Sequence, residues 1–384
     1  MTNRIGIVGA GHAGIEAAAA VRQAGVDVTV FSNENVPPYF RPRLPAVAMG
    51  QTEPDAIAMH PPAWYAERGI ELRLDAAVTS VAPQGCRLTA AGAETAFDTL
   101  LLCCGALPIR PRFPGEPAGL PVFTLWSLAD ALAVRPRARP VAHLAVIGGG
   151  MLGIECALRG RERQMSVTLI EKAPRLLPCL FGDGAGTVLN RLLADRAVDT
   201  RLGAAVETLR AADGGRVRIG TDDGRCVDAD FVLVCIGAGA NSALARQAGL
   251  RVERGVVSDA NLQAAAKLFS AGDVCQVGER VPRGTARDAL AQVRLAAQNS
   301  LAALAGRPLQ PFAFTVSAVS LRCAGVEVHA AGRAGGAGVF EQRLDDGSRP
   351  GVCQILSRLG PAIVGVQMVG TREGFDELVA QTAT

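Results

Sequence analysis

The stretch LAVIGGGMLGIECALRG, at residues 144–160, has the pattern of a buried strand followed by a glycine-rich turn and a helix. An earlier stretch, IGIVGAGHAGIEA at residues 5–17, has the same pattern. Each copy ends with an apolar run, predicted as a buried strand, that is followed by a glycine in a loop; these stretches are residues 97–115 and 230–245. This internal repeat predicts two similar α/β domains with parallel sheets.

Glycines recur at one spacing in both turns, namely Gly9, Gly11 and Gly14 in the first and Gly148, Gly150 and Gly153 in the second. In this spacing the first glycine permits a tight turn, the second lets the backbone approach a pyrophosphate, and the third lets helix and strand pack closely. The helix N-terminus then favours the phosphates. Such turns also serve packing alone, but two copies in the same context favour two dinucleotide sites.

An acidic residue about twenty positions after each turn decides what the turn holds. In the second copy it is Glu171, which ends the apolar run VTLIE and can accept hydrogen bonds from both hydroxyls of an adenosine ribose. A 2′-phosphate would meet a like charge there, which favours NADH over NADPH, although Lys172 and Arg175 could pair with a phosphate. In the first copy the matching position is Ser32, and Glu34 is either a solvated side chain or a ribose contact.

Size and charge exclude several classes of protein. With 384 residues, of which 49% are hydrophobic, the chain is long enough for two or three domains. It has no apolar run of the roughly 18 residues that a membrane span needs, and no secretory leader pattern precedes Ile5, so we expect a cytoplasmic protein and no membrane partner. A net charge of +3 without a basic run among aromatics predicts no nucleic-acid binding.

The ten cysteines are scattered, with no CxxC pair and no grouping with the four histidines. They therefore predict no metal site. We expect most of them to be small buried hydrophobic residues in a reducing compartment.

These patterns predict three domains: a first nucleotide-binding domain of residues 1–112 and 240–308, a second of residues 113–239, and a small C-terminal α+β domain of residues 309–384. The Pro- and Arg-rich residues 135–142 indicate a connector. Residues 268–277 predict a strand that ends in a loop, and residues 285–306 a helix that stops at Gly306. A last helix is expected around 372–382.

The set and order of these motifs resemble the FAD-dependent pyridine nucleotide-disulfide oxidoreductase superfamily over essentially the whole chain. Within it, the chain is most similar to rubredoxin reductases and to the ferredoxin reductases of oxygenase systems. The resemblance is carried by GAGHAGIEAA, NENVPPYFRPRL (33–44), LLCCGALP (101–108), VIGGGMLGIECA, IEKAPRLLP (170–178), CIGAGAN (235–241) and SAGDV (270–274). It implies that the first copy holds FAD, that the second holds the nicotinamide nucleotide, and that hydride passes from NADH to the flavin.

The resemblance also implies roles for single residues. Those expected around FAD are Gly9, Gly11 and Gly14 at the pyrophosphate, Glu34 at the ribose, Arg41 nearby, Gly105 at the bordering loop, Asp273 at the ribityl chain, and Gln292 and Val293 where the late helix approaches the flavin ring. The alternative for Asp273 is an N-cap or turn aspartate. Glu155 matches a glutamate near the nicotinamide and flavin N5, which makes it the candidate catalytic residue; the alternative is a solvated carboxylate on the helix surface.

Cysteines are missing where the disulfide reductases of the superfamily carry a redox pair. Residues 36–60 contain none. Cys103 and Cys104 are adjacent in an apolar strand end, where an unstrained disulfide is difficult and core packing is the better explanation. The flavin is therefore expected to pass electrons to an external acceptor, since it can accept an electron pair and release single electrons.

Three further features depart from the ferredoxin and rubredoxin reductases. Ala46 stands where a lysine commonly pairs with the glutamate near flavin N5, and Arg43 either reaches Glu155 from another direction or is an ordinary surface arginine. Val293 replaces a glycine, so its bulk is expected at the flavin edge. Residues 311–333 lack the tryptophan and aspartate of ferredoxin reductases and the lysine of rubredoxin reductases.

The leading hypothesis is an FAD-containing, NADH-dependent reductase that passes electrons to a small iron–sulfur carrier, rubredoxin or ferredoxin. The alternatives are a flavoprotein component of a larger complex of the nitrite reductase or dehydrogenase type, an enzyme that reduces oxygen or a quinone, and a non-catalytic flavin-binding subunit. Because the C-terminal domain is short, we expect a monomer.

Overall fold

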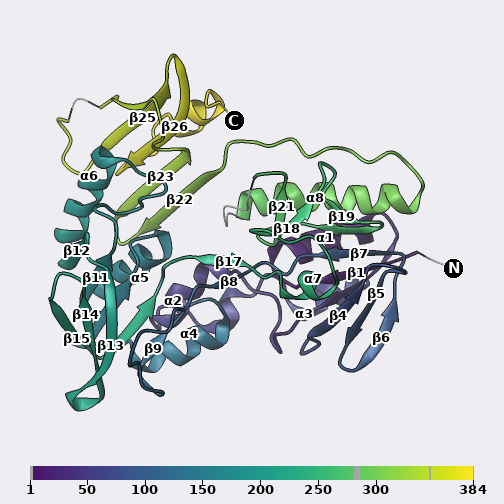
Figure 1. Cartoon of the computed structure of the whole chain (residues 1–384), viewed down its shortest axis with the longest axis horizontal. Helices are drawn as coiled ribbons and strands as arrows, with labels where there is room; N and C mark the ends of the chain where they lie inside the picture. The colour runs from purple at the N-terminus through teal and green to yellow at the C-terminus, as the bar shows by residue number, and fades with distance from the viewer. Residues whose placement is uncertain (1–2, 281–285, 346, 384) are drawn as a thin grey trace. The chain divides into compact units, whose positions relative to one another are not determined.

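The computed structural model describes residues 3–280, 286–345 and 347–383. It divides the chain into two compact units, each labelled by element in Figure 1: unit 1 comprises residues 1–40, 57–107 and 238–314, and unit 2 comprises residues 41–56, 108–237 and 315–384. Two differences from the predicted domains stand out. Residues 41–56, expected in the first nucleotide-binding domain, belong to unit 2, and so do the C-terminal residues, although these form a sheet of their own.

A six-stranded sheet forms the centre of unit 1, in the order β19-β20-β7-β1-β2-β3. Its strands are β1 (Arg4–Val8), β2 (Asp27–Phe31), β3 (Ile70–Arg73), β7 (Thr99–Leu102), β19 (Gln263–Ala265) and β20 (Leu268–Ser270). Every neighbouring pair is parallel except β19 with β20. The apolar side chains of these strands alternate between the two faces, so both faces need cover.

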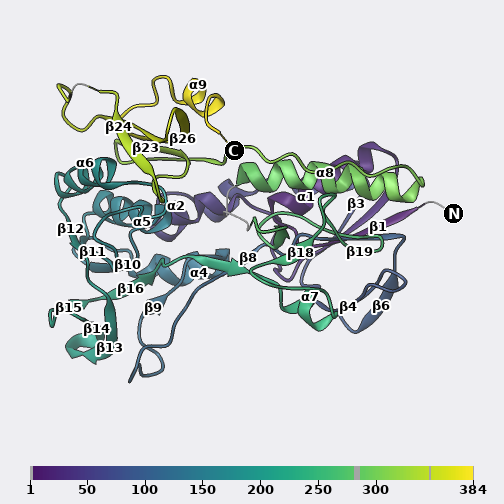
Figure 2. The same ribbon diagram turned by 45° about the horizontal axis from the view of Figure 1, so that its top comes forward.

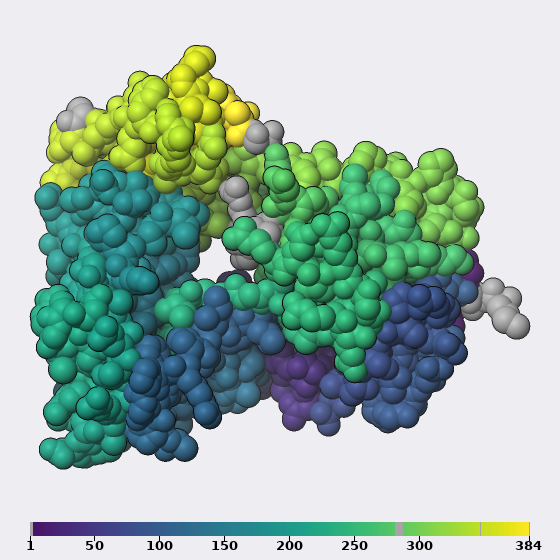
Figure 3. Space-filling view, viewed as in Figure 1, coloured from purple at the N-terminus to yellow at the C-terminus, as the bar shows by residue number. Residues whose placement is uncertain are grey.

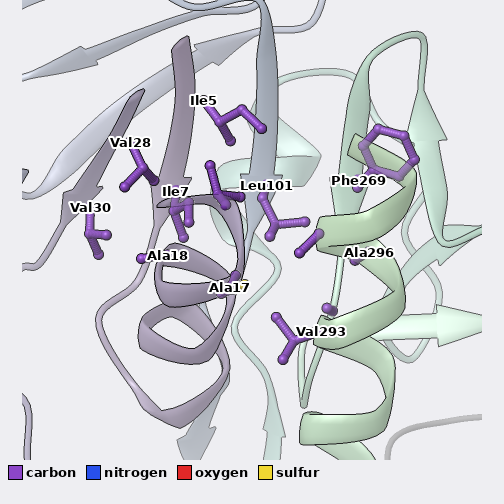
Figure 4. Close-up of a cluster of buried hydrophobic side chains, with 14 of the residues drawn as sticks. Ile5, Ile7, Ala17, Ala18, Val28, Val30, Leu101, Phe269, Val293 and Ala296 are labelled. Carbon is purple, nitrogen blue, oxygen red and sulfur yellow. The ribbon is translucent and has the colours of Figure 1, made fainter. Parts of the chain in front are cut away.

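Two helices cover one face of this sheet, α1 (His12–Gln23) and α8 (Ala286–Leu304), as Figure 2 also shows. Figure 4 shows the core between them, in which Ile7 of β1, Ala17 of α1 and Val293 of α8 lie together. The neighbouring side chain Val8 belongs to a second core on the opposite face, with Leu88 of β5 and Ala245 of α7. The remaining elements of unit 1 are α3 (Pro62–Glu67), β4 (Val78–Ala82), β5 (Arg87–Ala90), β6 (Ala93–Ala96), α7 (Ala243–Gln247), β18 (Val256–Ser258) and β21 (Cys275–Val277).

Unit 2 repeats the design with a five-stranded parallel sheet in the order β12-β11-β10-β16-β9. These strands are β9 (Val122–Phe123), β10 (His143–Ile147), β11 (Ser166–Glu171), β12 (Val198–Leu202) and β16 (Phe231–Val234). Helices and further strands around it are α2 (Leu44–Ala48), α4 (Leu128–Val134), α5 (Met151–Glu162), α6 (Asp183–Ala194), β13 (Val206–Ala212), β14 (Arg216–Thr221) and β15 (Cys226–Ala229). The short strands β8 (Ala106–Pro108) and β17 (Ala238–Ala240) pair with each other where the chain changes unit.

The C-terminal part of unit 2 is an antiparallel sheet in the order β22-β23-β26-β25-β24. Its elements are β22 (Ala318–Cys323), β23 (Val326–Gly332), β24 (Val339–Arg343), β25 (Cys353–Leu359), β26 (Ala362–Val369) and the helix α9 (Phe375–Ala380). Strands β25 and β26 contact α6, and in Figure 3 the yellow atoms of the C-terminal part lie against teal atoms of the same unit. The predicted fold class is thus confirmed: two Rossmann-like α/β domains with parallel sheets and a small α+β domain.

Some local predictions need correction. The strand expected at 268–277 is two strands, β20 and β21, separated by a turn. The expected connector at 135–142 begins with a 3₁₀ turn that follows α4 and lies inside unit 2. The late helix ends at Leu304, and Gly306 follows with φ +63° as a helix stop requires, whereas its expected first residue, Thr285, lies outside the described residues. No helix in the described ranges has the length and apolar character to cross a membrane.

Candidate functional site

The carboxyl ends of four parallel strands in unit 1 form one edge of its sheet. Val8 of β1 pairs in register with Phe31 and with Leu102, and Leu102 pairs with Ser270. The loops that follow these four residues therefore lie at the same edge, which is where ligands bind in open α/β sheets. These loops contain most of the predicted FAD residues, namely Gly9, Gly11, Glu34, Gly105 and Asp273.

The glycine turn of unit 1 has the space and the donors that a pyrophosphate needs. Gly9 has φ +109°, and a Cβ there would collide with the carbonyl oxygen of Cys103. A Cβ at Gly14 would collide with the carbonyl oxygen of Gly9, whereas one at Gly11 would meet no atom within 4 Å. Gly11 is the N-cap of α1 and supplies no side-chain cap, and no acidic side chain lies in the first turn. The residues present thus fit a bound phosphate group.

The glycine turn of unit 2 has the same geometry. Gly148 has φ +112°, and a Cβ there would collide with the carbonyl oxygen of Cys235. A Cβ at Gly153 would collide with the Gly148 oxygen, and one at Gly150 would again meet no atom within 4 Å. Gly150 caps α5 without a side-chain hydrogen bond. Each unit therefore carries its own turn that fits a dinucleotide.

Glu171 lies beside this second turn at the end of β11. Its Oε2 accepts a hydrogen bond from the Gly149 N–H at 2.6 Å, and its Oε1 accepts one from the Ala173 N–H at 2.7 Å. Arg175, a candidate partner for a 2′-phosphate, donates instead to the Phe181 carbonyl oxygen at 2.9 Å and pairs with Asp183 at 3.0 Å. The carboxylate is thus fixed beside the glycine turn by two backbone donors.

Glu34 lies in the loop after β2 and is partly buried. The hydroxyl of the buried Tyr39 donates to its Oε2 at 2.6 Å, and the Glu34 N–H donates to Ser32 Oγ at 3.1 Å. The carboxylate is therefore held at the carboxyl edge of the sheet in unit 1 rather than fully solvated.

Asp273 lies in the turn between β20 and β21. The preceding residue, Gly272, has φ +78°, and its N–H donates to Oε1 of the buried Gln292 at 2.9 Å. Gln292 thus stabilises the turn that contains Asp273. The expectation that the bulk of Val293 lies at the flavin edge is not met. Its side chain is fully buried in the core with Phe269 (Figure 4).

Residues 41–46 follow the loop that contains Tyr39. Arg41 lies in unit 2, where its Nη1 donates to the Trp126 carbonyl oxygen at 2.6 Å, so the structure does not place it in the unit that holds the other predicted FAD residues. Arg43 Nη1 donates to the Ala56 carbonyl oxygen at 2.8 Å and is exposed, which agrees with a surface arginine. Ala46 is buried on α2.

Glu155 lies in the second turn of α5, and its side chain is only 16% exposed, so the alternative of a solvated surface carboxylate is wrong. Its Oε1 accepts a hydrogen bond from Arg159 Nε at 2.8 Å. Burial raises the pKa of Glu155, and the Arg159 guanidinium acts in the opposite direction. Sequence reasoning missed Arg159, although its spacing of four residues from Glu155 on a helix was the available signal.

Cys103 and Cys104 show no sign of redox pairing. All ten cysteines of the chain are free, and Cys103 and Cys104 follow β7. Burial raises the pKa of Cys103 far above its ordinary value and that of Cys104 to about 12, so both are neutral thiols at physiological pH. Across the described ranges, no group of three or more His, Cys, Asp or Glu side chains could hold a metal ion.

Solved structures share this fold. A covalent putidaredoxin reductase–putidaredoxin complex superposes with a TM-score of 0.88 at 24% identity, over 99% of this chain and 93% of that chain. The water-forming NADH oxidase of Lactobacillus brevis gives 0.88 at 21% identity, over 100% of this chain and 92% of that one. At these identities the likeness concerns the fold alone.

Curated relatives are closer in sequence. The biphenyl dioxygenase system ferredoxin–NAD(+) reductase component of Paraburkholderia xenovorans (strain LB400) is 34% identical over 284 residues, which is 71% of this chain and 68% of the relative. The rubredoxin-NAD(+) reductase of Pseudomonas putida is 32% identical over 286 residues, 73% of each protein. A sequence profile described as pyridine nucleotide-disulphide oxidoreductase matches residues 3–298. The two glycine turns, each at the carboxyl edge of its own parallel sheet, are thus those of a chain that belongs to the pyridine nucleotide-disulphide oxidoreductase family.

Proposed function

We propose that the chain is an FAD-containing, NADH-dependent reductase that passes electrons to a small iron–sulfur carrier protein, rubredoxin or ferredoxin, without a redox-active disulfide. The observation that carries the proposal is the duplication of the dinucleotide edge, with one fitting glycine turn in each unit. Relatives at 32% and 34% identity bear the names of rubredoxin and ferredoxin reductases, which supports this choice of acceptor.

FAD belongs to the edge of unit 1 in this proposal. The backbone at Gly11 and the N-terminus of α1 would hold its pyrophosphate, Glu34 its ribose, and Asp273 its ribityl chain, with Gly105 at the bordering loop. When bound, FAD supplies the ability to accept two electrons together and to release them one at a time. The chain's own contribution is to hold the cofactor at this edge.

The nicotinamide nucleotide belongs to the edge of unit 2. The fixed carboxylate of Glu171 would accept hydrogen bonds from the adenosine ribose hydroxyls, and it would repel a 2′-phosphate. Arg175 is engaged with Phe181 and Asp183, which supports NADH over NADPH. Glu155, two residues after Gly153, is the candidate catalytic residue near the nicotinamide.

The acceptor is external to the chain. Residues 36–60 contain no cysteine, and the buried thiols of Cys103 and Cys104 are held neutral, so neither of these places offers a dithiol for the flavin to reduce. The free state of all ten cysteines supports a reducing, cytosolic location. A monomeric state stays a prediction.

The test is a spectral and kinetic one. The purified protein is expected to be yellow and to bleach on anaerobic addition of NADH, with NADPH much slower. Steady-state turnover with NADH is then measured with each of four electron acceptors: rubredoxin, a [2Fe–2S] ferredoxin, a quinone and oxygen. Bleaching with turnover only toward oxygen or the quinone would remove the carrier proposal, and a flavin that NADH does not bleach would favour a non-catalytic subunit.

A further inference from the structure

The carboxyl group of Glu155 is in an environment that opposes its charge. It lies on α5 with a side chain only 16% exposed. Burial is the largest influence on its pKa and raises it, because the ionised form loses water. A positive charge beside this carboxyl group therefore favours its ionised form.

Arg159 supplies that counter-charge from the next turn of the same helix. Its Nε donates to Glu155 Oε1 at 2.8 Å, and its own side chain is 22% exposed. A glutamate four residues before a basic side chain is the favourable orientation for a helix pair. Because both partners are largely buried, solvent screens this pair less than it screens an exposed one.

Gln51 fixes the far side of the guanidinium. Arg159 Nη1 donates to Gln51 Oε1 at 2.8 Å, and Gln51 Nε2 donates to Glu162 Oε2 at 2.9 Å. The backbone N–H of Gln51 in turn donates to the Ala46 carbonyl oxygen of α2 at 2.8 Å. Arg159 thus donates to two partners at once from two different nitrogens of its planar guanidinium. A lysine has a single ammonium nitrogen and cannot reproduce this geometry.

The other titratable groups near this pair act on Arg159 less strongly than Glu155 does. Cys156 follows Glu155 on α5, and its pKa is raised far above the ordinary value by its hydrogen bond to Cys235 and by burial. Cys323, on β22, has a pKa raised by burial to about 11. Both are neutral thiols at physiological pH. Glu162, which accepts the hydrogen bond from Gln51, also attracts the Arg159 charge, but less than Glu155 does.

We propose that Arg159 is the positioning residue of Glu155, and that Gln51 holds Arg159 in place, so that the carboxyl group keeps one orientation beside the second glycine turn and its ionised form is favoured. This inference rests on the proposed function, in which Glu155 faces the nicotinamide. The loop after α2 thereby takes part in the site through Arg159.

The primary experiment follows the ionisation of Glu155 itself in the full-length protein. Glutamate is labelled with ¹³C at the side-chain carboxyl, the Glu155 resonance is assigned by its loss in Glu155→Gln, and its titration midpoint is measured. Arg159→Met is expected to raise the midpoint by about one pH unit or more, because the counter-charge is lost while burial remains. Arg159→Lys is expected to raise it less, and Arg191→Met, on the exposed face of α6, to leave it unchanged.

The second readout separates positioning from stability. In anaerobic stopped-flow, Arg159→Met is expected to slow flavin reduction by NADH roughly tenfold, with the pH profile displaced upward and the Michaelis constant little changed. Arg159→Lys should recover part of the rate. Gln51→Leu keeps the ion pair, so it covers the case in which Arg159→Met does not fold, and it should displace the midpoint in the same direction by a smaller amount.

A Glu155 midpoint that is the same in the wild type, Arg159→Met and Gln51→Leu would overturn the inference, as would an equal displacement in Arg191→Met. The proposed function fails separately. If the midpoint moves as expected but NADH does not bleach the wild-type flavin, the pairing stands and the reductase assignment falls.

Discussion

The Glu171 carboxylate, at the end of β11, accepts a hydrogen bond of 2.6 Å from the backbone N–H of Gly149 inside the second glycine turn. One side chain thus connects the strand that ends at the site with the loop that would surround the pyrophosphate. Loss of this carboxylate should therefore affect nucleotide binding through the ribose and through the shape of the turn.

Glu171→Ala should raise the KM for NADH from severalfold to about a hundredfold, corresponding to roughly 1–3 kcal/mol for the lost partner of buried hydroxyls. Flavin content should not change, because the proposed FAD site is in unit 1 and Glu171 is in unit 2. Steady-state kinetics and the absorbance ratio of flavin to protein check both points. A variant that loses flavin while its NADH kinetics stay normal would show that the two nucleotides are assigned to the wrong units.

Asp273→Ala should purify with less than one FAD per chain and yet remain folded. The carboxylate lies in a turn, and the sheet strands on either side are held by their own backbone hydrogen bonds. Flavin content and circular dichroism measure the two properties. Full retention of tightly bound flavin would remove this site assignment.

Gln292→Leu tests whether the turn before Asp273 is held from α8. It leaves the buried Gly272 N–H without its acceptor, so the free energy of unfolding should fall by roughly 1–3 kcal/mol. FAD should also dissociate faster than from the wild type. Urea unfolding and dilution-induced flavin release give the two values, and faster flavin release at unchanged stability would mean that Gln292 contacts FAD directly.

Val293→Ala tests the assignment of this residue to the core. Because its side chain projects from α8 and is fully buried in the core with Leu101 and Phe269, truncation should lower the free energy of unfolding by roughly 1–3 kcal/mol. The flavin spectrum and the rate of reduction by NADH should stay as in the wild type. An altered flavin spectrum without loss of stability would restore Val293 to the flavin edge.

Alkylation of the native protein should leave both flavin reduction by NADH and onward transfer to ferricyanide essentially unchanged. Burial keeps Cys103, Cys104 and Cys275 protonated, with the pKa of Cys275 raised to about 11, and the thiolate is the reactive form. Serine or alanine at these positions should cost stability more than turnover. A long-wavelength charge-transfer band on reduction, or uptake of four electrons in an anaerobic titration, would instead indicate a thiol in the electron path.

The parts of the site that follow from local pattern could be predicted from the sequence. The glycine turns and Glu171 depend on a strand, a turn and a helix that are continuous in the chain, so their spacing alone places them. The burial of Val293 was also predictable, because Ala296, Ala297 and Ser300 continue the same buried stripe of α8 at helical spacing.

The membership of Arg41 in unit 2 and the contact of Gln51 with Arg159 were not predictable in this way. Gln51 and Arg159 are separated by 108 residues, and no periodicity in either segment encodes their meeting. Such contacts depend on how α2 packs against α5, which is a property of the folded unit.

The division of unit 1 into three separate segments has a consequence for how the protein is made. All five strands of the parallel sheet in unit 2 lie between residues 122 and 234, so a ribosome delivers them in one uninterrupted stretch. Strand β7, in contrast, waits for β20, which is translated more than 160 residues later. A nascent chain that has emerged from the ribosome as far as residue 237 can therefore complete the second sheet while an apolar strand edge in unit 1 is still open to unwanted pairing. We expect the chain to be most prone to misassembly during this interval, before residues 270–274 emerge.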